Sequence, residues 1–244
     1  MGDTGPGSTA AARAFAWAGA ALFALSLGYF LYTYVVTFGE TSPASTTPTW
    51  RAVAWNAALF GLFAAHHSVF ARTPVRAWMA TRVPPRLERS IYVWIASLLL
   101  IAVCARWEPL RGVAWEMSGA WRWVIRIPLV VGIWLTLRSA GIIDIWDLAG
   151  TRQLVDTSNF ELRTSNFRAE GPYGLVRHPI YLGWLIVVFS VPTMTMTRLA
   201  FAAISCLYLI LAIPLEERTL RATAGAAYER YAQRVRWRLI PGIY

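Results

Sequence analysis

The sequence predicts an all-α fold, a polytopic integral membrane helical bundle with about six transmembrane helices, and three observations support it. Of the 244 residues, 57% are hydrophobic and the mean hydropathy is +0.44, which is more apolar than an ordinary soluble domain. Apolar runs long enough to cross a bilayer recur along the chain. The 13 Trp and 10 Tyr supply amphipathic rings that favour membrane interfaces.

Six apolar runs define the expected membrane-spanning helices. A bilayer core of about 30 Å needs about 20 helical residues. The first run is longer than the apolar core of a signal peptide, so we expect it to be retained as a span. The expected spans cover about residues 15–38, 51–70, 90–107, 121–145, 178–194 and 198–215.

Changes in composition along the chain indicate three regions. Residues 1–12 are rich in Gly, Ser and Thr and are expected to form a disordered N-terminus. Residues 13–145 form a four-helix transmembrane N-terminal half. Residues 146–244 form a second half, which contains a transmembrane helical hairpin at 178–215, folded at the turn 192–197, and a cytoplasmic tail.

The positive charges indicate how the chain crosses the membrane. All 23 basic residues are Arg, the net charge is +10, and many of the Arg lie in the loop at about 72–89 and in the tail at about 218–238. The positive-inside rule places both segments and both termini in the cytoplasm, and we expect a bacterial inner-membrane protein. Because the Arg lie at the ends of apolar runs, the expected partner is the lipid bilayer, with no nucleic acid.

Two polar groups lie at opposite ends of the hairpin. Arg177, His178 and Tyr181 occur where a polar segment becomes an apolar run, and Glu216 and Glu217 end the next apolar run. A hairpin folded between them returns Glu216 to the membrane face of His178. Each residue alone could be a membrane anchor or a solvated helix end, but their convergence favours a binding site.

The residue types in this cluster suit a particular ligand. Arg177 and His178 can hold a carboxylate, and the ring or hydroxyl of Tyr181 can face a cation. Glu216 and Glu217 can accept hydrogen bonds from ribose hydroxyls or from an ammonium group. S-adenosylmethionine carries all of these groups, and we predict that it is the cofactor.

Motifs in the second half resemble a known superfamily. Residues 171–183 read Gly-Pro-Tyr-Gly-Leu-Val-Arg-His-Pro-Ile-Tyr-Leu-Gly, and residues 216–220 read Glu-Glu-Arg-Thr-Leu. Together with Ile-Pro-Gly at 240–242, they resemble the isoprenylcysteine carboxyl methyltransferase and phospholipid methyltransferase superfamily. Further stretches are similar to membrane methanethiol S-methyltransferases, and these are residues 67–72, 88–93, 147–153 and 192–195.

This resemblance implies an enzyme that transfers a methyl group from S-adenosylmethionine to a small thiol such as methanethiol, giving a thioether such as dimethyl sulfide. It implies a C-terminal cofactor-binding region, which the charge pattern places on the cytoplasmic side. The expected cofactor-binding residues are Tyr173, Arg177, His178, Pro179, Tyr181, Gly183, Glu216 and Glu217.

Five residues are candidates for activating a thiol acceptor. A thiol with a pKa of about 8.5 is only a few per cent thiolate at neutral pH, so modest activation suffices. Arg177 or Arg152 could lower the pKa of the thiol, and His67, Asp144 or Asp147 could receive its proton. His67 could instead hydrogen-bond between helices, and the two Asp, three apart on one face of a continuing helix, could simply be solvated. Where the methanethiol subfamily has an Asn-His pair, this chain has Ile143 and Asp144, and this departure leaves the thiol acceptor open.

The two cysteines, Cys104 and Cys206, both lie within apolar runs. A disulfide framework or a thiolate metal site is therefore not expected. A metal site built from His66, His67 and Asp144 is poorly supported by their number and spacing, so the sequence predicts no metal.

Three other functions are weighed against the leading one. A methyltransferase could act on an isoprenylcysteine carboxylate or a phospholipid amine, a lipid-soluble acceptor reached from the bilayer. A sterol-reductase-like oxidoreductase would bind a dinucleotide with more phosphate, and the acid pair Glu216 and Glu217 argues against it. A non-catalytic membrane protein would have no need of both halves of the cluster.

Overall fold

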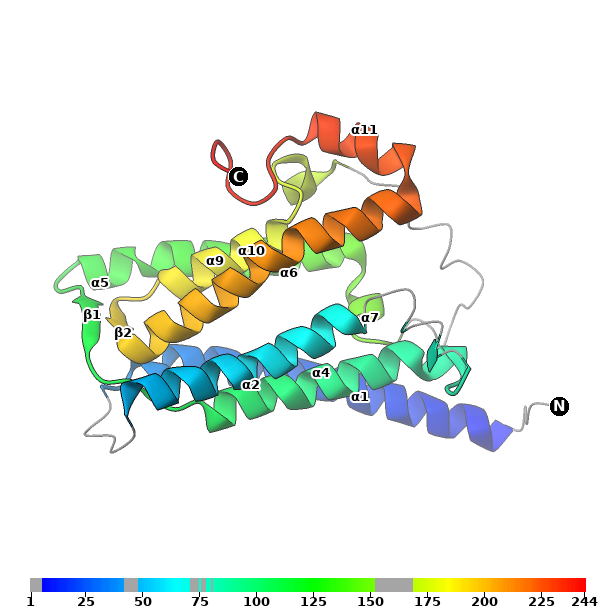
Figure 1. The fold of residues 1–244 in the computed structure, drawn as a ribbon, viewed down its shortest axis with the longest axis horizontal. Coiled ribbons are helices and arrows are strands. Elements are labelled where there is room, and N and C mark those ends of the chain that lie inside the picture. The colour runs from blue at the N-terminus through cyan, green and yellow to red at the C-terminus, as the bar shows by residue number, and fades with distance from the viewer. Residues whose placement is uncertain (1–5, 42–47, 71–74, 76–77, 80, 152–168) are drawn as a thin grey trace.

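A computed structural model describes residues 6–41, 48–70, 75, 78–79, 81–151 and 169–244, and these residues are mostly helical. Figure 1 shows the long helices running side by side, with two short strands at one end of the molecule and α11 towards the other. The bounds are α1 Pro6–Val35, η1 Thr37–Gly39, α2 Thr49–Val69, α4 Pro85–Arg106, β1 Val113–Glu116, α5 Trp121–Val124, α6 Arg126–Ile143, α7 Ile145–Leu148, η3 Gly171–Gly174, α9 Pro179–Phe189, β2 Thr193–Thr195, α10 Met196–Ala224 and α11 Ala226–Arg234.

Helix α1 extends further towards the N-terminus than the sequence predicts. It begins at Pro6, so residues 6–12 belong to a helix and not to the disordered segment expected at 1–12. The run Ala10–Ala12 explains the difference, because alanine has the highest intrinsic helix propensity. Short Gly, Ser and Thr residues next to a long apolar helix can join it at little cost.

Four of the described helices are long and apolar enough to cross a membrane. Helix α2 has 21 residues but is not one of these four. Helix α9 is apolar but has only 11 residues, about half of what a bilayer core requires. The four candidate spans are Ala10–Gly39, Arg86–Arg106, Trp121–Ile143 and Met196–Ala224.

A two-stranded antiparallel sheet departs from the all-α expectation. Strand β1 pairs with β2, with Val113 opposite Thr195 and Glu116 opposite Thr193. The expected span 178–194 therefore ends early, at Phe189. Pro192 cannot donate a backbone hydrogen bond, and β-branched Thr residues favour extended structure.

The buried side chain of Arg198, in α10, connects this helix to α1 and β2 at the strand end of the molecule. Its side chain is 4% exposed. Its guanidinium donates 2.9 Å to the carbonyl oxygen of Tyr34, and it also donates to the carbonyls of Val35 and Thr193. A cation is favourable at the C-terminus of a helix, where the last carbonyls lack helical partners.

Aromatic packing around Phe201 forms the core beside this joint. Phe201 is completely buried. Aromatic pairs with centroids 4.5–7 Å apart are favourable beyond the area they bury. The rings within this range of Phe201 are those of Phe30, Tyr34, Phe38, Phe60, Trp107 and Trp184.

Helices α6 and α9 pack backbone against backbone at Gly132 and Gly183. A Cβ atom at Gly183 would lie 2.8 Å from the carbonyl oxygen of Gly132 and 2.2 Å from Oγ1 of Thr136. Only glycine permits this approach. Gly183, which the sequence assigns to the cofactor site, thus lies in a helix–helix contact.

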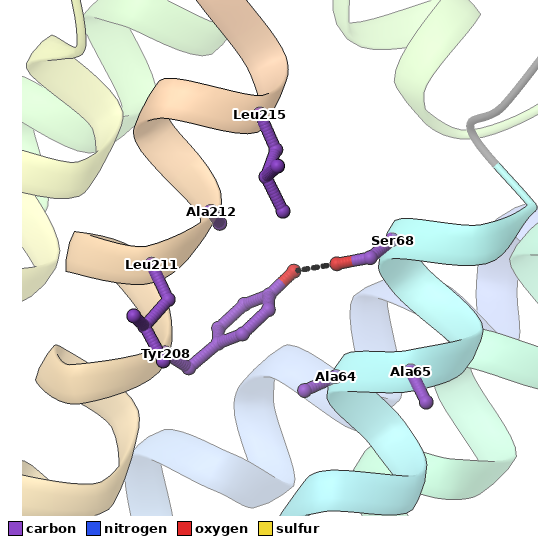
Figure 2. Close-up of a pocket in the computed structure, with 7 residues that line it drawn as sticks. All are labelled: Ala64, Ala65, Ser68, Tyr208, Leu211, Ala212 and Leu215. Carbon is purple, nitrogen blue, oxygen red and sulfur yellow. Dashed lines mark hydrogen bonds between the residues drawn. The ribbon is translucent and has the colours of Figure 1, made fainter.

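A groove with a volume of about 210 Å³ lies between α2 and α10. In Figure 2 the hydroxyl of Tyr208, from α10, meets the hydroxyl of Ser68, from α2, at 3.1 Å. The rest of the lining is apolar and consists of Ala64, Ala65, Leu211, Ala212 and Leu215.

Candidate functional site

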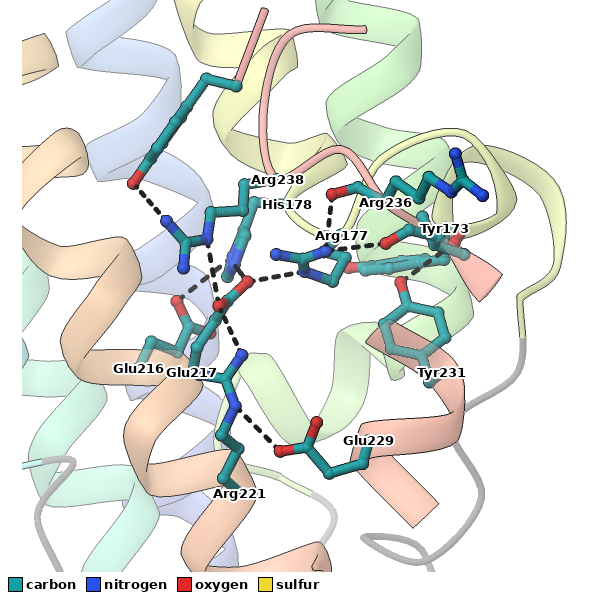
Figure 3. A network of polar contacts seen from close by, with 12 residues as sticks. Tyr173, Arg177, His178, Glu216, Glu217, Arg221, Glu229, Tyr231, Arg236 and Arg238 are labelled. Atoms are coloured by element: carbon teal, nitrogen blue, oxygen red, sulfur yellow. Dashed lines mark hydrogen bonds and ion pairs between the residues drawn. The ribbon is translucent and has the colours of Figure 1, made fainter. Parts of the chain in front are cut away.

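The helical hairpin brings His178 and Glu216 together. His178 immediately precedes α9, where Pro179 occupies the first turn and its missing N–H is no loss. Glu216 lies in the last third of α10. The distance from Nδ1 of His178 to Oε2 of Glu216 is 3.6 Å, so the two groups that the sequence places at one membrane face lie at one corner of the structure (Figure 3).

Glu217 is the most deeply buried acid of this corner. Its side chain is fully buried. Its carboxylate lies 2.6 Å from Nε of Arg177, 3.2 Å from Nε of Arg238 and 3.3 Å from Nη2 of Arg221. His178 adds a fourth nitrogen, Nε2, at 3.5 Å. Since a buried charge is tolerated only when it is paired, these cations are what allow Glu217 to be there.

Arg177 connects this buried acid to the C-terminal segment. Its Nη1 donates to the carbonyl oxygens of Val235 at 2.7 Å and Arg236 at 2.8 Å. Its backbone N–H donates to Trp237, and that of His178 donates to Arg238, both at 2.9 Å. The guanidinium of Arg177 is therefore engaged within the protein, where it positions the segment that covers the site.

Tyr181, His178 and Glu216 form the more open part of the corner. The hydroxyl of Tyr181 donates to Oε2 of Glu216 at 2.9 Å. Its ring is stacked on His178 with an interplanar angle of 6°. The side chain of Glu216 is 44% exposed, and Nε2 of His178 has no geometrically good hydrogen bond within the described residues. This part of the corner can still accept a ligand.

Helix α11 supports the corner from the tail. The Tyr231 hydroxyl donates to the carbonyl oxygen of Tyr173 at 3.0 Å. Burial raises the pKa of Tyr231 to about 12, with Arg177 lowering it and Glu217 raising it. The phenol therefore stays protonated at physiological pH and keeps its donor for Tyr173, which lies in η3 just before Arg177.

Two residues that pair with Glu217, and one that accepts from Arg177, were not among the predicted site residues. Arg221 could have been found, because it follows Glu217 by four residues on the same helix face. Arg238 is 21 residues away, and no local spacing signals its contact. Val235 contributes only a backbone carbonyl, which side-chain reasoning cannot detect.

His67, a candidate proton acceptor, takes part in an interhelical hydrogen bond. Its Nδ1 lies 2.6 Å from the hydroxyl of Tyr92, which joins α2 to α4. The structure thus contains the interhelical hydrogen bond that the sequence offered as an alternative.

The two aspartates do not share a helix face, so the expectation of a continuing helix is wrong. Helix α6 ends at Ile143, and Asp144 has a φ of +116°, a conformation that costs energy in a residue with a side chain. The Asp144 carboxylate accepts a hydrogen bond from the N–H of Trp146 at 3.0 Å and caps α7. Asp147 lies in α7, where its carbonyl accepts from Arg89 at 3.2 Å.

Some residues named in the sequence analysis lie outside the described part of the chain. The stretch 147–153 is described only to residue 151, and the stretch 67–72 only to residue 70. Two Arg of the basic loop at 72–89, Arg72 and Arg76, also lie outside it.

Comparison with known proteins identifies relatives along most of the chain. A "Methanethiol S-methyltransferase 2" from Bradyrhizobium diazoefficiens is 35% identical over 223 residues, which are 91% of this chain and 85% of the relative. A "Methanethiol S-methyltransferase" from Crocosphaera subtropica is 36% identical over 179 residues, 72% of this chain and 70% of the relative. The protein "Nurim" from Sus scrofa is 35% identical over 180 residues, 69% of this chain and 68% of the relative.

No family model matches the chain, and no solved structure matches it. The apolar helices and these relatives together define an integral membrane methyltransferase. The chain belongs to the family of the methanethiol S-methyltransferases, within the wider isoprenylcysteine methyltransferase-like group.

Proposed function

We propose that this protein is a membrane-embedded methyltransferase that uses S-adenosylmethionine to methylate a small thiol, such as methanethiol, to a thioether such as dimethyl sulfide. The observation that carries the proposal is the half-open corner of His178, Tyr181 and Glu216 beside the fully paired Glu217, in a chain whose relatives are named methanethiol S-methyltransferases.

The residues of this corner fit the proposed cofactor. The Glu216 carboxylate, 44% exposed, can accept from ribose hydroxyls or an ammonium group. The ring face of Tyr181 suits a cation. The ring of His178 lies between the two acids, with Nδ1 3.6 Å from Glu216 and Nε2 3.5 Å from Glu217.

The remaining predicted cofactor residues have supporting positions in this proposal. Arg177 and Glu217 pair with each other at 2.6 Å and hold the C-terminal segment in place. Tyr173 anchors η3 through Tyr231, and Pro179 begins α9.

In the proposed reaction the cofactor, when bound, would supply an activated methyl group. The thiolate of the acceptor would form the new carbon–sulfur bond with its electron pair. The pair of the broken bond would remain on the cofactor's sulfur. The thiol proton must pass to a base of the protein or to water. The candidates for that base remain His67, Asp144 and Asp147, and Nδ1 of His67 already lies 2.6 Å from the hydroxyl of Tyr92. Asp144 already caps α7.

The proposed topology has about six membrane-crossing segments, with both termini and the corner in the cytoplasm of a bacterium. Helix α2 would add a fifth crossing to the four candidate spans, and α9, with only 11 residues, would cross together with the residues that flank it. The Arg-rich tail supports a cytoplasmic C-terminus, because cytoplasmic loops are enriched in basic residues.

In the decisive experiment, the purified protein in nanodiscs is incubated with labelled S-adenosylmethionine and one of three acceptors. The acceptors are methanethiol, a prenylcysteine and a phosphatidylethanolamine. We expect labelled dimethyl sulfide with methanethiol, measured by gas chromatography. Labelled prenylcysteine ester or methylated lipid in its place would contradict the thiol acceptor. Absence of S-adenosylhomocysteine binding by calorimetry would contradict the cofactor.

A further inference from the structure

We infer that the groove between α2 and α10 is the binding site for the methyl acceptor, and that the Ser68–Tyr208 hydroxyl pair positions the acceptor's sulfur. This inference rests on the proposed function, since it concerns the acceptor of the same reaction. The acceptor class to which it commits is a small, uncharged, apolar thiol that reaches the groove from the bilayer.

The size and lining of the groove fit such a molecule. Its volume of about 210 Å³ is below the roughly 300–1,000 Å³ of pockets that hold drug-sized ligands. Its accessible lining is almost entirely apolar, and the hydroxyls of Ser68 and Tyr208, 3.1 Å apart, are hydrogen-bonded to each other between α2 and α10. A few polar groups in an apolar pocket orient a ligand, and a hydroxyl is a suitable partner for a thiol.

The groove opens towards the surface that the bilayer covers. Leu211 is 60% exposed and Leu215 is 43% exposed, and both belong to a candidate membrane span. Leu62 and Val69, on α2, are also exposed apolar residues. An apolar thiol dissolved in the hydrocarbon could therefore enter without passing through water.

The groove also leads to the charged corner. Tyr208, Ala212 and Glu216 succeed one another at intervals of four residues on α10, and residues four apart lie on the same helix face. The hydroxyl of Tyr181 donates to Glu216 at 2.9 Å, so Glu216 links this face of α10 to the charged corner. An acceptor in the groove would thus lie along the same helix face as Glu216, beside the proposed cofactor residues.

The test is a matched pair of substitutions on one helix. Ala212→Leu fills the groove, whereas Ala203→Leu adds the same atoms at an exposed position of α10 outside it. Because one methylene in a pocket changes specificity by about 10–200-fold, we expect Ala212→Leu to raise the KM for methanethiol at least about 10-fold. We expect Ala203→Leu to leave it unchanged and both variants to bind S-adenosylhomocysteine as wild type does, measured by calorimetry.

A second variant tests the hydroxyl pair. Tyr208→Phe keeps the ring and removes the donor, so kcat/KM for methanethiol should fall about 10-fold while the affinity for S-adenosylhomocysteine stays constant.

The outcomes separate the two claims. A wild-type protein that methylates methanethiol, with Ala212→Leu retaining the wild-type KM, would overturn the groove as acceptor site and leave the proposed function standing. A wild-type protein that forms no dimethyl sulfide would overturn both.

Discussion

Helix α10 buries one charged side chain near each of its ends, and the two charges have different kinds of partner. Arg198, at the strand end, donates to the neutral carbonyls of Tyr34, Val35 and Thr193. Glu217, at the other end, is surrounded by the guanidinium groups of three Arg. The first arrangement completes a joint between elements, and the second creates a charged corner beside a half-exposed acid.

The difference indicates how a structural charge can be told from a functional one. The guanidinium of Arg198 donates to backbone carbonyls of α1 and the β2 segment. Glu217 instead holds side chains in place, namely the guanidinium groups of three Arg and the ring of His178, whose Nε2 lies 3.5 Å away. Substitutions at the two ends should therefore separate stability from ligand binding.

The largest effect is expected from Glu217→Gln. Removing the charge leaves Arg177, Arg221 and Arg238 without their shared carboxylate, and breaking a buried pair costs about 3–5 kcal/mol. The midpoint of thermal unfolding in detergent should fall strongly, and S-adenosylhomocysteine binding should be lost with it. Wild-type values of both quantities would show that the corner is not organised around this acid.

Arg198→Met should lower stability without altering binding. The variant leaves helix-terminal carbonyls unpaired, at a cost of about 2–3 kcal/mol. We expect a lower unfolding midpoint and an unchanged calorimetric affinity for S-adenosylhomocysteine. If Arg198→Met lost as much affinity for S-adenosylhomocysteine as Glu217→Gln, the two buried charges of α10 would not differ in their effect on ligand binding.

Gly183→Ala tests the packing of α9 against α6. The added carbon would lie 2.2 Å from Oγ1 of Thr136, and overpacking costs about 1–3 kcal/mol. The matched control is Gly61→Ala, where the added carbon meets nothing within 4 Å and where alanine should stabilise the helix by about 0.5–1 kcal/mol. If Gly183→Ala weakened S-adenosylhomocysteine binding at unchanged stability, Gly183 would instead contact the cofactor.

The smallest effect on folding is expected from Glu216→Gln. A partly exposed acid contributes within about 0.5 kcal/mol to stability, but its loss from the corner should weaken S-adenosylhomocysteine binding about 10-fold, or 1.4 kcal/mol. Glu229→Gln is the control, since the Glu229 side chain is 51% exposed and pairs with Arg221 at 3.1 Å. Equal affinities in the two variants would count against Glu216 as a ligand contact.

The sequence predicts the long helices well, because apolar runs bounded by polar residues leave few alternatives in a bilayer. The run at 90–107 corresponds to α4, and the run at 198–215 to the apolar part of α10. The fifth predicted helix, at 178–194, is too long, and the reason is local. Its apolar composition continues to Met194, but the chain bends at Pro192, and Thr193–Thr195 form β2, which pairs with β1.

The site is predictable where it depends on a hairpin and unpredictable where it depends on the tail. Glu216 and His178 can be brought together from the lengths of two runs. The backbone carbonyls of Val235 and Arg236 that bind Arg177 leave no trace in side-chain chemistry. The break at Asp144 is also hidden, since a residue other than glycine at positive φ is uncommon.

The hydrogen bond between Arg198 and the carbonyl of Tyr34 joins residues 164 positions apart. During synthesis α1 leaves the ribosome well before α10 is translated, so the terminal carbonyls of α1 can form their hydrogen bonds with Arg198 only late in synthesis. Completion of the first helix thus depends on insertion of the last long one. A nonsense mutation before Arg198 would consequently leave the amino-terminal part of the bundle unfinished as well as removing its carboxyl-terminal part.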